Sequence, residues 1–182
     1  SACAIVTTVE KAKEMGYKDF VSVKALQLSL SNGTEMGHDS WDFDHFITTE
    51  IAAERASKEA GVKNPREEIS MMEVHDCFSI TELVTYEDLH ISPRGGAIKD
   101  VMDGFYDADG QIPCQLDGGL KCFGHPIGAT GLRMLYEMYL QLQGRAGERQ
   151  LPRDPVFGLT HNLGGFPSQN VSSVTIVGRE GA

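Results

Sequence analysis

Three short stretches of the chain each place a histidine beside cysteine, glycine or asparagine. They are residues 75–78 (HDCF), 124–126 (GHP) and 161–165 (HNLGG). An imidazole moves protons near neutral pH, a thiol with a lowered pKa acts as base or nucleophile, and backbone N–H groups of a glycine-rich turn stabilise an oxyanion. If the fold brings these stretches together, they predict acid–base chemistry at a substrate carbonyl.

The thiol of Cys77 has two interpretations. His75 and the N-terminus of a helix predicted to begin near Ser79 would each stabilise a thiolate, and Cys77 would then be an acid/base group. A free cysteine is more often a small buried apolar residue, and the spacing alone favours that alternative.

His125 lies between Gly124 and Pro126 in a loop that also contains Gly128 and Gly131. A loop with so few side chains lets a substrate approach the backbone, and the proline fixes its local geometry. The alternative is a histidine that is satisfied by a neighbouring carbonyl group.

His161 follows a predicted buried strand and precedes Gly164 and Gly165. Its ring would donate to an oxyanion beside backbone N–H groups, or it would be a strand-end histidine in a tight turn. The sequence leaves both interpretations open.

A zinc site is a further alternative, because Cys114, Cys122 and His125 are close in sequence. Structural zinc sites usually pair cysteines across a gap of about two to four residues, and no two cysteines of this chain have that spacing. The sequence therefore predicts no metal.

Strands and helices are predicted to alternate along the chain. Apolar patterns predict strands at residues 2–7, 19–31, 69–74, 156–161 and 170–178. Helical periodicity predicts helices at residues 7–16, 47–61, 79–89, 97–102 and 132–142. This order predicts the α/β class, with the chemistry in loops at strand ends.

Local signals refine these elements. Thr48 or Thr49 is predicted to cap the second helix, and Ser79 is predicted to form a capping box with Glu82. Residues 162–167 (NLGGFP) are predicted to form a tight turn. The last helix is predicted to turn one face to the core, and that face carries Leu132, Leu135, Tyr136, Tyr139 and Leu142.

Composition limits the class of protein. A chain of 182 residues with 41% hydrophobic content can bury one core, so one domain is expected. The net charge of −10 argues against nucleic acid as a partner, because phosphate binding needs a basic face. Four cysteines without disulfide spacing predict reduced thiols and a cytoplasmic protein. No apolar run approaches the roughly 20 residues that cross a bilayer, so no membrane association is predicted.

The motifs HDCF (75–78), GGLKCFGHPIGATG (118–131) and HNLGG (161–165), in this order, resemble the C-terminal half of thiolases. The closest resemblance is to the sterol-carrier-protein-type thiolases and to bacterial and archaeal acetyl-CoA acetyltransferase-like relatives. It implies a mixed β-sheet with helices on both faces, which is half of a layered αβαβα fold. It also implies that residues 1–182 form a thiolase-like C-terminal domain, that residues 1–18 end the N-terminal half, and that the half bearing the nucleophile is absent.

The resemblance implies a Claisen condensation or the thiolytic cleavage of a 3-oxoacyl-CoA. His125 would activate the nucleophile and bind the thioester oxygen, His75 would replace an asparagine of other branches, and Cys77 would be the acid/base thiol. The last loop would hold the oxyanion and substrate through His161, Asn162, Gly164 and Gly165. Further substrate contacts would come from Phe123, Gly124, Pro126 and Phe166.

The resemblance implies acyl-CoA thioesters and coenzyme A as substrates, with no permanently bound cofactor. The expected protein partners are the N-terminal thiolase half, on the same or a separate chain, and a second copy in a homodimer or larger oligomer, because a lone half would expose an apolar helix surface. Two alternatives remain. One is a retro-aldolase on a CoA thioester that works with an accessory zinc-ribbon/OB-fold protein, and the other is a non-catalytic assembly subunit.

Overall fold

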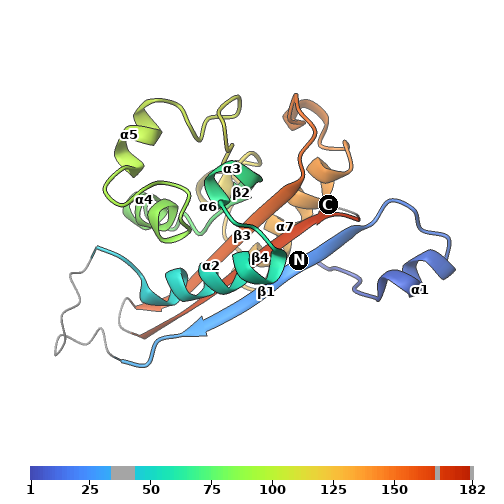
Figure 1. The fold of residues 1–182 in the computed structure, drawn as a ribbon, viewed down its shortest axis with the longest axis horizontal. Helices are drawn as coiled ribbons and strands as arrows, with labels where there is room; N and C mark the ends of the chain where they lie inside the picture. Colours follow the sequence, from blue (N-terminus) through green and yellow to red (C-terminus); the bar gives the residue numbers. More distant parts are fainter. Residues whose placement is uncertain (34–43, 167–168, 181–182) are drawn as a thin grey trace.

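The computed structural model describes residues 1–33, 44–166 and 169–180, which are built around a four-stranded mixed sheet (Figure 1). From one edge to the other, the strands are β1 (Val21–Leu30), β4 (Gln169–Arg179), β3 (Phe157–Phe166) and β2 (Ile69–Glu73). The β1–β4 and β4–β3 pairs are antiparallel, whereas β3 and β2 are parallel. The last strand in sequence therefore lies inside the sheet.

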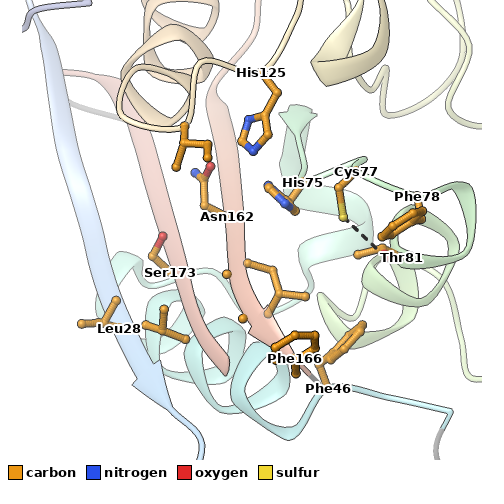
Figure 2. A pocket seen from close by; sticks show the side chains of 15 residues that line it. Leu28, Phe46, His75, Cys77, Phe78, Thr81, His125, Asn162, Phe166 and Ser173 are labelled. Carbon is orange, nitrogen blue, oxygen red and sulfur yellow. Dashed lines mark hydrogen bonds between the residues drawn. The ribbon is translucent and has the colours of Figure 1, made fainter. Parts of the chain in front are cut away.

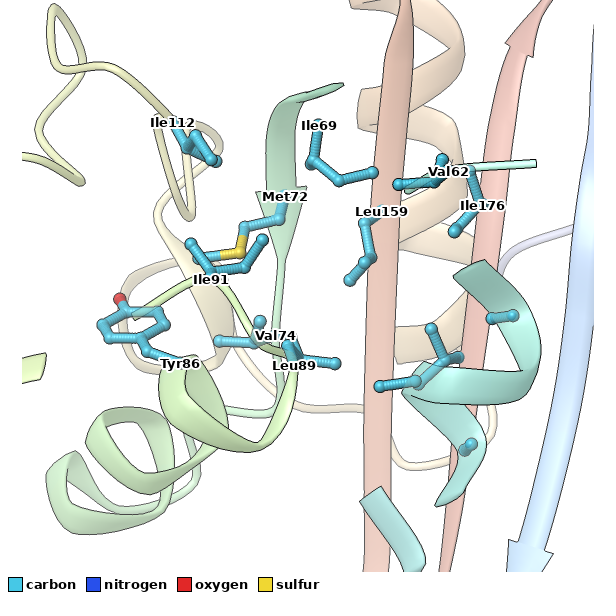
Figure 3. Close-up of a cluster of buried hydrophobic side chains, with 14 of the residues drawn as sticks. Val62, Ile69, Met72, Val74, Tyr86, Leu89, Ile91, Ile112, Leu159 and Ile176 are labelled. Atoms are coloured by element: carbon cyan, nitrogen blue, oxygen red, sulfur yellow. The ribbon is translucent and has the colours of Figure 1, made fainter. Parts of the chain in front are cut away.

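Helices cover both faces of this sheet. Helix α2 (Ile47–Ala60) packs across β1 and β4 on one face, and α7 (Thr130–Leu142) packs on the other, mainly against β3 (Figure 1). On the α2 face, a large core joins Leu159 and Ile176 of the sheet to the helices and loops that follow β2 (Figure 3). A smaller core on the α7 face contains Met71, Met138, Leu142, Leu151 and Val177. The predicted α/β class with helices on both faces is confirmed.

The strand predicted at residues 2–7 is wrong. These residues are exposed and lie in no strand, and they lead to α1 (Val9–Glu14), which stands apart from the sheet (Figure 1). An apolar stretch becomes a strand only where a neighbour accepts and donates its backbone hydrogen bonds, and no described strand lies beside this one. The hydroxyl of Thr8 caps α1 by accepting from the N–H of Lys11.

The long connection from β2 to β3 carries most of the helices. They are α4 (Ser79–Asp88), α5 (Ala97–Met102), α6 (Gly119–Cys122) and α7, followed by a short 3-10 helix at Gly147–Arg149, while α3 (Pro65–Glu68) precedes β2. Helix α5 matches its prediction. Because β2 and β3 are parallel, this crossover has to pass over the sheet, and it delivers the predicted loops to one end of both strands.

The predicted threonine cap of α2 is wrong. Phe46 is the cap residue, and Thr48 and Thr49 lie inside the helix with buried hydroxyl groups. Thr48 donates to the side chain of Asn170, and Thr49 donates to Ser172 Oγ at 3.1 Å. The hydroxyl groups therefore link the helix to the sheet, which satisfies them better than the helix terminus would.

The predicted capping box of α4 is also absent. Ser79 is the first residue of the helix rather than its cap, and Glu82 instead accepts a hydrogen bond from the hydroxyl of Tyr86 at 2.8 Å. The buried tyrosine needs this acceptor, because burial leaves it no water.

The packed face of α7 agrees with the predicted one only at Leu142, which is buried in the smaller core, and at Leu135, which packs against that core. Its buried residues include Arg133, Met134, Glu137, Met138 and Gln141, whereas Tyr136 is 60% exposed. The prediction fails because ion pairs let charged groups be buried: Arg133 pairs with Asp117, and Arg149 binds Glu137 at 2.9 Å. Leu132, Tyr136 and Tyr139 form an apolar stripe on the other side of the helix, here called the outer face of α7.

Glu73 gives the fold a testable pH dependence. Its side chain is fully buried, and burial followed by the nearby charge of Asp117 raises its pKa to about 9, although Arg133 Nη1 lies 3.2 Å away. A carboxyl group whose pKa rises on folding stabilises the fold below its ordinary pKa, and this contribution is lost as the pH rises toward 9. Glutamine does not titrate, so Glu73→Gln lacks this loss. We expect the free energy of unfolding of the variant, relative to that of the parent protein, to rise by on the order of 1 kcal/mol per pH unit between pH 6 and 8.

The measurement is urea unfolding of the purified protein at pH 6, 7 and 8. Glu10→Gln, on the exposed surface of α1, is the matched control and leaves the pH profile unchanged. Parallel profiles for the parent and Glu73→Gln would show that Glu73 is ionised in the folded state.

Candidate active site

A pocket of about 670 Å3 lies at the C-terminal ends of the parallel strands β2 and β3 (Figure 2). The loop after β2 contributes His75 and Cys77, the loop before α7 contributes His125, and β3 contributes Asn162. The remaining lining residues are Leu28, Phe46, Phe78, Thr81, Ile127, Leu163, Gly164, Gly165, Phe166, Val171 and Ser173. The structure therefore brings parts of all three predicted stretches to one site.

The two histidines form the centre of the pocket. The ring centroids of His75 and His125 are 5.1 Å apart, with an interplanar angle of 77° (Figure 2). Burial, and then the charge of His125, lowers the pKa of His75, so this ring is neutral at physiological pH. Its Nδ1 atom is buried and has no hydrogen-bond partner among the described residues. A neutral imidazole has one N–H group, and that donor can hydrogen-bond a substrate oxygen.

Thr130 orients the ring of His125. The Nδ1 atom of His125 lies 2.7 Å from Thr130 Oγ1, and the hydroxyl of Thr130 donates to the carbonyl of Pro126 at 3.2 Å. Because a hydroxyl has one proton, Thr130 accepts a hydrogen bond from Nδ1–H, and this leaves the lone pair on Nε2. Nothing in the sequence pattern singled out Thr130, which looks like an ordinary first residue of a helix.

Asn162 and His161 point to opposite faces of β3. Asn162 lines the pocket, and its side-chain Nδ2 lies 3.5 Å from the position that a Cβ would take on Gly131. The ring of His161 is 0% exposed on the α2 face, where its Nε2 lies 3.1 Å from Thr49 Oγ1. Burial, and to a lesser extent His75, lowers the pKa of His161 to about 3, so the ring is neutral. The structure thus brings Asn162, and not His161, to the pocket.

The length of β3 explains why Asn162 and His161 point in different directions. The tight turn predicted at residues 162–167 does not begin at Asn162, because β3 continues to Phe166. Successive side chains of a strand alternate between its faces, so His161 points to α2 while Asn162 points the other way, to the pocket.

Cys77 lies at the surface of the pocket, not in the core. Its thiol donates a long hydrogen bond, 3.8 Å, to Thr81 Oγ1 in the first turn of α4 (Figure 2). The alternative of a buried apolar cysteine is therefore wrong, and the thiol is accessible to a molecule in the pocket.

Asp76 fastens the His75 loop to the segment that leads to His125. Its buried carboxylate accepts a hydrogen bond from the N–H of Leu120 at 2.8 Å. Gly119 has a positive φ of 60°, and a Cβ on it would lie 2.6 Å from Asp76 Oδ2. Only glycine lets the carboxylate approach this closely. No pattern in the sequence singles out Asp76, although the paired glycines at 118 and 119 indicate a close backbone contact.

We expect Gly119→Ala to destabilise the protein by about 2–3 kcal/mol, because the added methyl group has to displace Asp76 in a backbone conformation that disfavours alanine. Thermal unfolding of the purified protein tests this. Gly128→Ala is the matched control, because no atom lies within 4 Å of its Cβ position, and it leaves the melting temperature nearly unchanged. An equal change in both variants would contradict the packing argument.

Some of the other predicted site residues line the pocket, and some do not. Gly164, Gly165 and Phe166 line the pocket, whereas Phe123, Gly124 and Pro126 are outside its lining. Phe123 instead lies against the guanidinium of Arg133, 5.1 Å from ring centroid to Cζ. In contrast, Phe46 lines the pocket although no local pattern had indicated it.

The remaining cysteines do not join the pocket. Cys114 packs against the larger core, where burial raises the pKa of its thiol, and Cys122 is exposed on α6. Within the part of the chain that the structure describes, no group of three or more His, Cys, Asp or Glu side chains is arranged to hold a metal ion. Over the same residues, none of the helices is long and apolar enough to span a membrane.

Comparison with known proteins agrees with the motif order. The thiolase C-terminal domain-like family matches residues 31–178. The acetyl-CoA acetyltransferase of Methanothermobacter thermautotrophicus is 40% identical over 166 residues, which cover 91% of this chain and 42% of that protein. Sterol carrier protein 2 of Oryctolagus cuniculus is 43% identical over 121 residues, which cover 65% of this chain and 21% of that protein. The chain thus spans less than half of the length of these relatives.

A solved structure shares the fold. The Ltp2-ChsH2(DUF35) aldolase aligns with a TM-score of 0.72, over 89% of this chain and 40% of that chain, at 19% identity. At this identity the likeness concerns the fold alone. The family match over residues 31–178 shows that this chain belongs to the thiolase family, whose C-terminal domain it contains.

Proposed function

We propose that this chain is the C-terminal catalytic half of a thiolase-like acyltransferase, which joins two acyl-CoA molecules or cleaves a 3-oxoacyl-CoA with coenzyme A. The observation that carries this proposal is the convergence of His75, Cys77 and His125 on one pocket. Two imidazoles and an accessible thiol are the groups that proton abstraction beside a thioester carbonyl requires.

The proposed condensation assigns each group a step. The Nε2 atom of His125 accepts the proton of a nucleophilic thiol, which then takes the acyl group from the first acyl-CoA and releases coenzyme A. The Cys77 thiolate removes an α-proton from the second acyl-CoA, and hydrogen bonds from His75 and from Asn162 Nδ2 stabilise the enolate oxygen. The enolate carbon attacks the acyl-enzyme carbonyl, and the nucleophilic thiolate leaves.

The nucleophilic thiol has to come from outside the pocket residues described here. Cys77 is the sole cysteine in the lining of this pocket, and the proposal already uses it as the acid/base group. We therefore assign the nucleophile to an N-terminal thiolase half, on the same or a separate chain, with residues 1–18 as the end of that half.

Two apolar surfaces support a partner of this kind. The outer face of α7 has Tyr136 at its centre, and on the same side of the sheet Leu26, Leu28 and Leu30 of β1 are exposed. Uncovered apolar surface of this extent is typical of an interface. We propose that the N-terminal half covers the outer face of α7, and that a second copy completes a homodimer or larger oligomer.

The test uses the protein purified together with its N-terminal half. We expect it to convert acetoacetyl-CoA and coenzyme A into two molecules of acetyl-CoA, and to exchange the methyl protons of acetyl-CoA for deuterium in D2O. Liquid chromatography with mass spectrometry measures both. A protein that binds acyl-CoA but shows neither cleavage nor exchange would refute the proposal.

Retro-aldol cleavage of a 3-hydroxyacyl-CoA is the second candidate. It needs a base for the hydroxyl proton and an oxyanion site, which the His75–His125 pair would supply, but no acylated cysteine. The fold shared with an aldolase structure keeps this candidate open. An accessory zinc-ribbon/OB-fold protein would be its partner, and insensitivity to loss of Cys77 would distinguish it.

A further inference from the structure

The pocket is divided into a polar and an apolar end. His75, Cys77, His125 and Asn162 gather at one end, whereas Phe46 and Phe166 lie at the other (Figure 2). Leu163 and Val171 also contribute to the lining. A bound molecule with a reacting carbonyl at the histidines would therefore extend its other end over aromatic and aliphatic side chains.

Among the residues that the structure describes, the apolar end offers no partner for a charged group. Apart from the two histidines, the described residues that line the pocket include no Lys, Arg, Asp or Glu. Two carboxylates near the backbone of Phe46, those of Asp88 and Glu50, both contact Arg94. A carboxylate placed here would lose its hydration without a compensating ion pair, which is costly.

The wall at Phe46 is fixed before a ligand arrives. The N–H of Phe46 donates to Asp88 Oδ2 at 2.8 Å, and its carbonyl accepts from the N–H groups of Thr49 and Glu50 at 2.8 and 3.1 Å. Its backbone is therefore held from both sides, at the start of α2. A side chain on such a backbone limits the length of a ligand better than one on a free loop.

The opposite wall is set by the β3–β4 hairpin. Phe166 pairs with Gln169 in the ladder, and a Cβ on Gly165 would lie 2.3 Å from the carbonyl oxygen of Gln169. This close approach requires glycine at 165, and it places the ring of Phe166 at the edge of the pocket.

We propose that the pocket selects 3-oxoacyl-CoA thioesters with an uncharged apolar acyl chain longer than that of acetoacetyl-CoA, and that Phe46 and Phe166 determine the chain length. This inference rests on the proposed thiolase-type function. The thioester and 3-oxo groups lie at the histidines, and the remaining carbons of the acyl chain lie against the phenylalanines.

The test compares kcat/KM for thiolysis of 3-oxobutanoyl-, 3-oxohexanoyl- and 3-oxooctanoyl-CoA by the protein with its N-terminal half. We expect a rise of up to about fourfold per methylene. The matched charged substrate is 3-oxoadipyl-CoA, which has the six-carbon chain of 3-oxohexanoyl-CoA and a terminal carboxylate. We expect it to react at least about 100-fold more slowly than 3-oxohexanoyl-CoA.

Substitutions at Phe46 are expected to change the chain-length preference, which a general loss of activity or stability would not do. Phe46→Ala lengthens the preferred chain and Phe46→Trp shortens it, so the ratio of kcat/KM for the eight-carbon and four-carbon substrates moves in opposite directions. Phe166→Ala lowers the ratio, because it removes apolar contact from the open side. Met102→Ala, exposed on α5 away from the pocket, is the control and leaves the ratio unchanged.

Binding separates this inference from the proposed function. Calorimetric titration with butyryl-, hexanoyl- and octanoyl-CoA requires no turnover. Tighter binding of the longer chains without any thiolysis would support the apolar acyl site and refute the proposed reaction. Equal kcat/KM for the four- and eight-carbon substrates, or efficient use of 3-oxoadipyl-CoA, would overturn the inference and indicate that a protein segment covers the phenylalanines instead.

Discussion

Replacing His125 with asparagine is expected to lower kcat/KM for thiolysis of a 3-oxoacyl-CoA by about 10³-fold, because the variant loses the base that activates the nucleophile. His125 is exposed, so its ring contributes little to the core and the fold should tolerate the change. Steady-state kinetics measure the loss, and circular dichroism checks that the fold is retained. A loss below tenfold with an intact fold would remove His125 from the proposed mechanism.

Thr130 supplies a graded control for this prediction. Thr130→Ser keeps the hydroxyl that accepts from His125 Nδ1–H, whereas Thr130→Val removes it. We expect the serine variant to keep most of the activity, and the valine variant to lose about tenfold and to shift the pH profile of kcat/KM. A serine variant as impaired as the valine variant would mean that Thr130 acts through packing alone.

Replacing Cys77 with alanine is expected to abolish deuterium exchange into acetyl-CoA and to lower the condensation rate by at least about 10³-fold, because the proposed mechanism assigns removal of the α-proton to Cys77. The acylation half-reaction uses a different thiol. Rapid-quench measurement should therefore still show up to one acyl group transferred per active site from an acyl-CoA.

The outcome for Cys77 also decides between the two candidate functions. Loss of exchange with retained acylation supports the acyltransferase. If Cys77→Ala instead cleaves a 3-hydroxyacyl-CoA as fast as the parent, the thiolase proposal fails and the retro-aldolase gains support. Thr81→Val is the structural control, because it removes the hydroxyl that accepts a hydrogen bond from the Cys77 thiol. We expect it to lower the condensation rate by less than tenfold.

The sequence predicts the fold class and β2 well, because a short apolar run followed by polar residues is a local signal. It fails at residues 161–166, where one residue of register decides which side chain enters the pocket. The position of the hairpin turn depends on the pairing of β3 with β4, which no local pattern records. Asn162 therefore faces the pocket while His161 is buried behind the sheet.

The prediction of the buried face of α7 also fails, for a different reason. Its apolar stripe was assigned to the core of this chain, yet the buried face carries Arg133 and Glu137. These charges are tolerated because their partners come from distant segments, among them Asp117 in the loop before α6 and Arg149 after α7. An apolar stripe on a helix predicts that this face will be buried. The sequence does not tell whether it is buried against the same domain or against another domain or chain. Phe46 was missed for a similar reason, since tertiary contacts alone bring it to the pocket.

The position of β4 has a consequence for how the chain folds. It is the last of the four described strands to leave the ribosome, yet β1 and β3 each pair with it and not with each other. Until β4 arrives, β1 has no strand to pair with, and its leucines and open backbone are available to other chains. Pairing across such long sequence separations is slow. We therefore expect nascent chains to depend on chaperones, and substitutions that weaken β4 to lower the yield of folded protein more than the activity of the molecules that fold.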